Sequence, residues 1–155
     1  MSTVTEKTTT KVSPIPPGFH TVTPYLIVQG AERLIEFLKQ AFGAEEIYRS
    51  NQPDGTIGHT EMQIGDSMIE LAEGNERWQP RLCSLHLYVP DTDATYRRAL
   101  EAGATSLMEP EDAFYGDRAA GVADPSGNHW FIATRQEELT HEEMTRRAQA
   151  AGKAG

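Results

Sequence analysis

The sequence predicts an α+β protein built from two tandem βαβββ modules. Three observations support this class. Apolar residues recur at helical spacing in two stretches, short alternating runs typical of strands surround each stretch, and the second half repeats the order of the first. The chain has 155 residues, which is enough for one domain that buries roughly two-thirds of its unfolded surface without disulfides.

The first half begins with a strand expected over Val22 to Val28, which is rich in β-branched residues. A helix follows over Ala31 to Phe42, whose apolar residues share one stripe, and Gly43 stands where helices commonly stop. The pair Gly65-Asp66 predicts a tight hairpin turn. We expect three strands in this part, over 45–50, 58–64 and 67–72.

The second half repeats this plan at a nearly constant offset. Leu26-Ile27-Val28 aligns with Leu87-Tyr88-Val89, and Gly43-Ala44 aligns with Gly103-Ala104. Such landmarks favour an internal duplication over two coincidentally similar halves. The elements expected here are a strand over Ser84 to Val89, a helix over Asp91 to Ala102, and strands over 105–109, 117–123 and 128–134.

The two ends lie outside this repeat. Residues 1–18 are rich in Thr, Ser, Lys and Pro and are expected to form a disordered tail. The domain then covers 19–136, with modules over about 19–73 and 83–136. In 137–155, Thr140 followed by Glu143 fits a capping box, which predicts a short helix to about Ala150 and a frayed end.

Composition excludes several functional classes. The chain has 14 basic and 23 acidic residues, a formal charge of −9, which disfavours nucleic acid and anionic membranes as partners. No apolar run approaches the ~20 residues that span a bilayer, and the N-terminus lacks the apolar stretch of a secretory signal. One cysteine, Cys83, excludes an internal disulfide. We therefore expect a cytoplasmic protein.

Two βαβββ units in tandem resemble the vicinal oxygen chelate superfamily, which comprises glyoxalases, bleomycin resistance proteins and extradiol dioxygenases. The resemblance covers residues 20–136 and includes segments similar to the PhnB-like branch: Thr23-Pro24-Tyr25-Leu26, Ala41-Phe42-Gly43-Ala44, Ile64-Gly65-Asp66, Tyr115-Gly116-Asp117-Arg118 and Asp124-Pro125-Ser126-Gly127. It implies sheets that curl into an open cup holding a metal or ligand, and it implies a homodimer. The chemistry stays open, because this fold hosts many activities.

Strand alternation sorts the side chains into a core face and a cup face. We expect Val22, Met62 and Leu71 on the core face of the first half, with Val22 under the helix, and Trp130 under the second helix. The cup face is polar and aromatic, which favours a small-molecule site. Arg118 is a further candidate, either as a clamp for an anionic group or as a loop anchor paired with Asp117. The ligand-binding candidates are Tyr25, His59, Glu61, Glu70, His86, Tyr88, Arg118, His129 and Phe131.

The resemblance also allows a test for metal. Metal-dependent members take one His or Glu from the first and last strand of each half, and these positions hold Thr23, Glu70, Ser84 and Phe131 here. Only Glu70, the candidate catalytic residue, is a good ligand, so we expect the usual site to be lost and no cofactor to be required.

A displaced divalent-metal site remains an alternative. If the strands that carry His86 and His129 pair antiparallel, the two histidines lie opposite each other and combine with Glu70, or with Glu61. Otherwise each histidine only forms a hydrogen bond. Three functions follow: a metal-independent small-molecule-binding protein, which we favour, a metal-dependent lyase, isomerase or dioxygenase, and a non-catalytic interaction domain with a filled cup.

Overall fold

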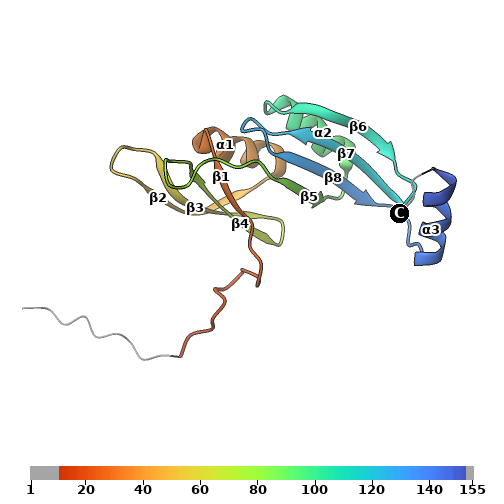
Figure 1. Cartoon of the computed structure of the whole chain (residues 1–155), viewed down its shortest axis with the longest axis horizontal. Helices are drawn as coiled ribbons and strands as arrows, with labels where there is room; N and C mark the ends of the chain where they lie inside the picture. The colour runs from red at the N-terminus through yellow and green to blue at the C-terminus, as the bar shows by residue number, and fades with distance from the viewer. Residues whose placement is uncertain (1–10, 153–155) are drawn as a thin grey trace, which may run out of the picture.

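The computed structural model describes residues 11–152, which form two four-stranded sheets lying side by side (Figure 1). The first sheet has the order β1-β4-β3-β2 and the second the order β5-β8-β7-β6. The strands are β1 (Tyr25–Val28), β2 (Glu45–Asn51), β3 (Ile57–Ile64), β4 (Ser67–Glu73), β5 (Ser84–Tyr88), β6 (Thr105–Asp112), β7 (Asp117–Ala123) and β8 (His129–Arg135).

One helix accompanies each sheet, and a third follows the second sheet. α1 (Ala31–Phe42) and α2 (Thr92–Glu101) lie next to each other, whereas α3 (His141–Ala150) stands at the far end of the second sheet (Figure 1). The element order confirms the α+β class and the βαβββ duplication. We call residues 25–73 the first module and residues 84–135 the second module. Within 11–152, no helix is both long and apolar enough to cross a membrane.

The first and last strands of each module pair in parallel, β1 with β4 and β5 with β8. The cause is the connectivity. A helical crossover leaves β2 parallel to β1, and two hairpin reversals return β4 to the same direction. The antiparallel pairing considered for the strands of His86 and His129 is therefore wrong.

The first strand is shorter than expected and begins at Tyr25. Pro24 has no N–H to give to a ladder, and the Thr23 hydroxyl donates locally to the carbonyl of His20 at 3.2 Å. Val22, expected under the helix, is 83% exposed. The other boundaries agree with the sequence to within three residues.

The two chain ends are described only in part. Residues 1–10 of the expected tail and 153–155 of the expected frayed end lie outside the described residues, and 11–18 contain no helix or strand. Thr140 caps α3, because its hydroxyl accepts from the Glu143 N–H at 3.1 Å.

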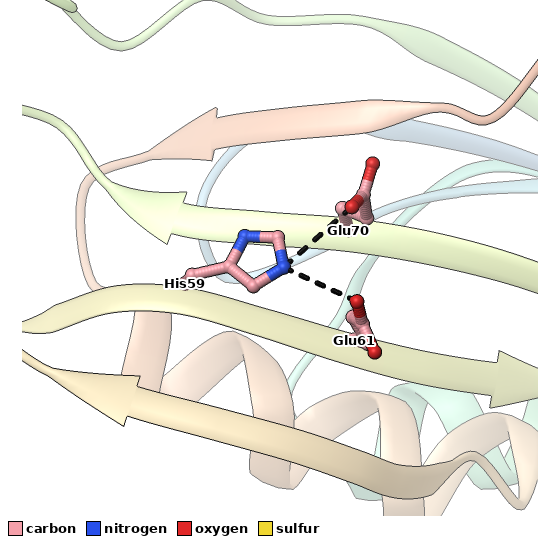
Figure 2. A group of neighbouring side chains, drawn as sticks. All are labelled: His59, Glu61 and Glu70. Atoms are coloured by element: carbon pink, nitrogen blue, oxygen red, sulfur yellow. Dashed lines mark hydrogen bonds and ion pairs between the residues drawn. The ribbon is translucent and has the colours of Figure 1, made fainter. Parts of the chain in front are cut away.

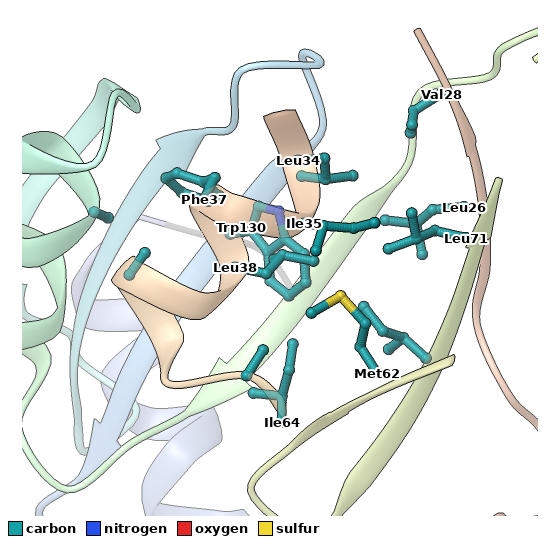
Figure 3. Close-up of a cluster of buried hydrophobic side chains, with 14 of the residues drawn as sticks. Leu26, Val28, Leu34, Ile35, Phe37, Leu38, Met62, Ile64, Leu71 and Trp130 are labelled. Atoms are coloured by element: carbon teal, nitrogen blue, oxygen red, sulfur yellow. The ribbon is translucent and has the colours of Figure 1, made fainter. Parts of the chain in front are cut away.

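The core lies between the helices and one face of each sheet. Leu34, Ile35 and Leu38 of α1 are fully buried and pack in one cluster with strand residues such as Met62 and Leu71 (Figure 3). The cluster continues into the second module, where Trp130 of β8 lies 5.0 Å from the Phe42 ring at the end of α1. We expected Trp130 under the second helix, but it packs against the first. The helices thus cover one face of each sheet and leave the opposite face open.

Candidate functional site

The two open faces carry different residues. The first open face, on the first module, is defined by Tyr25, Tyr48, His59, Glu61 and Glu70, and the second open face, on the second module, by His86, Tyr88, Gly121, His129 and Phe131. Cross-strand partners share a face, so the registers Tyr25–Glu70, Glu70–Glu61 and Glu61–Tyr48 form one row across the first sheet.

His59 stands beside this row and joins its two carboxylates (Figure 2). Its Nε2 lies 3.5 Å from a carboxylate oxygen of Glu61 and 3.5 Å from one of Glu70. The three side chains are only 25–30% exposed. The ligand atoms of the three residues lie within 4.8 Å of one another, and no other group of three His, Cys, Asp or Glu in residues 11–152 does so. This cluster is the strongest candidate site.

Two tyrosines border the cluster. The Tyr25 hydroxyl lies 3.3 Å from His59 Nδ1, and the Tyr48 ring centroid is 6.2 Å from that of His59. Burial, and then the charge of Glu70, raise the pKa of Tyr25, which keeps its hydroxyl protonated at neutral pH. Nδ1 of His59 therefore lies at the Tyr25 hydroxyl, and Nε2 faces the carboxylates of Glu61 and Glu70.

A pocket of about 860 Å³ adjoins the cluster. Its lining includes Tyr25, Ile27 and Ala72, and the hydroxyl of Tyr25 lies 3.3 Å from His59 of the cluster. Its walls are the turn between β2 and β3 and the loop after β4, which contributes Trp78. The pocket is large enough for a small organic molecule.

The second open face does not form a comparable cluster. His86 lies opposite Phe131, and His129 lies opposite Ser84, so the two histidines are a diagonal step apart on adjacent strands. Glu70 belongs to the other sheet. The structure therefore does not bring together the displaced set His86, His129 and Glu70. Tyr88 is 68% exposed and stacks near His86, with ring centroids 4.6 Å apart.

The four positions implied by the family resemblance do not suit a metal ion. The Thr23 hydroxyl is hydrogen-bonded to the His20 carbonyl, and Phe131 offers no ligand atom. Ser84 is a neutral hydroxyl, which leaves Glu70 as the only charged ligand of the four.

Arg118 lies on the helix side of the second sheet. Its guanidinium donates to both carboxylate oxygens of Asp93 on α2, at 2.6 and 2.9 Å, and to Asp112 at 3.3 Å. The hydrogen bond from Arg118 lowers the pKa of the Asp93 carboxyl. These contacts favour the anchoring alternative over a ligand clamp, although the anchors are Asp93 and Asp112 instead of Asp117.

The Glu61–Glu70 pair was accessible from the sequence. A two-residue turn at Gly65-Asp66 fixes the hairpin register, and counting back from it places Glu61 opposite Glu70. His59 then follows on the same face, two residues before Glu61. All three residues are among the ligand candidates predicted from the sequence, but the predicted metal site takes its histidines, His86 and His129, from the second module and only its carboxylate from the first.

Comparison with known sequences supports the fold and places the chain in a family. A sequence profile of the Glyoxalase/Bleomycin resistance protein/Dioxygenase superfamily matches residues 18–132. An uncharacterized protein of Mycobacterium bovis is 33% identical over 138 residues, which cover 79% of this chain and 88% of the relative.

Solved structures share the architecture. TioX from Micromonospora sp. ML1 is 22% identical, with a TM-score of 0.65 over 74% of this chain and 97% of TioX. TnmS3, an antibiotic binding protein from Streptomyces sp. CB03234, is also 22% identical, with a TM-score of 0.61 over 76% of this chain and 96% of TnmS3. The family match, the relative and the duplicated modules agree: this chain belongs to the glyoxalase/bleomycin resistance protein/dioxygenase superfamily.

Proposed function

We propose that the protein binds a small organic molecule on the first open face, and that a flat cationic guest suits this face best. The proposal rests on four side chains that lie on one face of the sheet, beside a pocket of about 860 Å³. They are the carboxylates of Glu61 and Glu70 and the rings of Tyr25 and Tyr48. Carboxylates attract a positive charge, and aromatic faces bind flat or cationic groups.

Trp78 supports the same guest. It lines the pocket and is 57% exposed, so its ring is available to a ligand. The guanidinium of Arg77 already lies 5.2 Å from the centroid of this ring. A cation in the pocket can use a similar contact, which contributes about 0.5–1 kcal/mol at exposed sites.

The solved structures are consistent with a binding role, since TnmS3 is described as an antibiotic binding protein. We also propose that the chain is related to the PhnB-like branch, because five segments resemble it, and that the protein is cytoplasmic. Because the first open face adjoins an open pocket, we favour a binding protein over an interaction domain with a filled cup.

A homodimer is part of the proposal. Large apolar side chains are exposed on both open faces, including Tyr48 at 53%, Tyr88 at 68% and Phe131 at 38%. A second copy that covers part of these faces removes apolar area from water. Sedimentation at twice the chain mass of 17.2 kDa is the expected result, and a single-chain mass across a wide concentration range contradicts it.

The test uses two flat dyes of similar size, proflavine as the cation and fluorescein as the anion, titrated calorimetrically in the presence of chelator. We expect proflavine to bind and fluorescein to bind more weakly or not at all. In the double variant Glu61→Gln, Glu70→Gln, proflavine affinity should fall about tenfold or more, since contacts to charged groups contribute about 1.5–3 kcal/mol.

The matched control is Glu45→Gln, an exposed carboxylate at the edge strand of the same sheet, which should leave the affinity unchanged. Equal binding of the two dyes, or an unchanged affinity in the double variant, contradicts the proposed site. No binding of either dye favours the interaction-domain alternative.

A further inference from the structure

We propose that His59, Glu61 and Glu70 bind one divalent transition-metal ion on the first open face, with Tyr25 orienting the imidazole. This set differs from the one that the family resemblance implies, because β3 supplies two of the three ligands and the second module supplies none. The ion and the guest proposed above share Glu61 and Glu70, so binding of the ion is measured without dye and binding of the guest is measured with chelator.

The first argument is distance. Two ligand atoms bound to one ion at about 2.1 Å, with an angle of 90–110° between them, lie about 3.0–3.4 Å apart. His59 Nε2 already lies 3.5 Å from an oxygen of each carboxylate. These two distances need to shorten by only a few tenths of an ångström. The oxygens of Glu61 and Glu70, which lie within 4.8 Å of each other, can approach through rotamer changes of the two Glu side chains.

The second argument is charge. Glu61 and Glu70 are directly opposite on adjacent antiparallel strands, where like charges destabilise the sheet. Throughout residues 11–152, the only ion-pair partner of either carboxylate is His59. No Lys or Arg of the described chain neutralises the pair, although Arg49 of β2 does so for Glu46 and Glu32. A divalent cation offsets this repulsion.

The third argument is the orientation of the imidazole. A metal-ligating histidine almost always has its second ring nitrogen held by a hydrogen-bond partner. Tyr25 fills this role, with its hydroxyl 3.3 Å from His59 Nδ1. Nε2 is thereby directed at the two carboxylates, which is the geometry shown in Figure 2.

The ligand chemistry narrows the ion. One imidazole and two carboxylates suit Mn²⁺, Fe²⁺, Co²⁺ or Zn²⁺, and three protein ligands leave coordination positions for water or for an oxygen of a guest. The ligand side chains remain 25–30% exposed, so an ion has access from solvent.

The experiment uses the full chain without an affinity tag, stripped with chelator and dialysed against Mn²⁺, Co²⁺ or Zn²⁺. We expect about one ion per chain by elemental analysis and a Co²⁺ absorption spectrum that titrates with the same stoichiometry. His59→Ala, Glu61→Gln and Glu70→Gln should each lower metal affinity at least tenfold. Tyr25→Phe, which removes only the outer partner, should lower it about tenfold.

The controls are His86→Ala and His129→Ala on the second open face, which should bind the ion as the wild type does. Circular dichroism of each stripped variant shows whether it is folded. An absence of retained ion, or equal stoichiometry in His59→Ala and the wild type, overturns the proposal. Proflavine binding in chelator is measured separately, so the site for the guest and the site for the ion can fail independently.

Discussion

The two modules share one backbone plan but differ in the carboxylates that they place on the open face of the sheet. The strand registers show which positions of the two modules correspond. Tyr25, Glu70 and Glu61 form a row across the first sheet, and His86, Phe131 and Gly121 form the corresponding row across the second. The first module thus directs two carboxylates onto its open face, where the second has a ring and a glycine.

The second module instead uses its charged groups for structure. Arg118 joins β7 to α2 through Asp93, and Asp124 organises the turn before β8. Together with the proposed site, this comparison assigns binding to the first sheet and internal anchoring to the second.

The largest effect on the free energy of unfolding is expected at a buried carboxylate of the second module. Asp124 is 5% exposed, and its carboxylate accepts from Trp130 Nε1 at 2.9 Å and from Asn128 Nδ2 at 3.1 Å. Asp124→Ala leaves these buried donors unpaired and should lower the free energy of unfolding by about 2–4 kcal/mol in urea denaturation.

The corresponding hairpin turn of the first module provides the control. Asp66 is exposed, and its only hydrogen bond from a described side chain is that of the neighbouring Ser67 hydroxyl. Asp66→Ala should change the stability by less than about 0.5 kcal/mol. Equal losses in the two variants contradict the assignment of a structural role to Asp124 in particular.

A smaller effect of opposite sign is expected on the first open face. Without metal, Glu61→Gln removes one of two like charges on opposite strands and should raise the free energy of unfolding by about 0.2–1 kcal/mol. Urea denaturation with chelator measures this value. A clear loss of stability in the stripped variant argues against repulsion between Glu61 and Glu70 as the reason that a cation binds there.

The smallest effect is expected in α3, which follows only the second module and has no buried residues. Hydrogen bonds from Arg146 and then Arg147 lower the pKa of Glu143 from 4.5 to about 2. Because this folded-state pKa is depressed, the stabilisation is present above pH 4.5 and is lost as the pH falls towards 2. An NMR titration of the Glu143 carboxyl should show this low pKa, and a midpoint near 4.5 contradicts the ion pairs.

The sequence predicted the faces of the strands well, because a period of two assigns each residue to one side of a sheet. It placed Met62 and Leu71 in the core and His59, Glu61 and Glu70 on the open side, as the burial of these residues confirms. Alternation does not encode strand direction, however. The hypothesis that His86 and His129 lie opposite each other depended on the relative direction of their strands, and it is wrong because these strands are parallel.

Two other features required the tertiary structure. Arg118 stands at a strand start whose pattern is equally compatible with a clamp and an anchor, and only the position of Asp93 on α2 distinguishes them. Likewise, Trp130 alternates correctly into the core, but which helix covers it depends on how the modules pack.

The most direct test of the central claim, that the first open face is the binding face, is an anomalous difference map from crystals grown with Mn²⁺. We expect one strong peak per chain, between Nε2 of His59 and the carboxylates of Glu61 and Glu70. A peak at His86 or His129, or no peak within reach of His59, contradicts it.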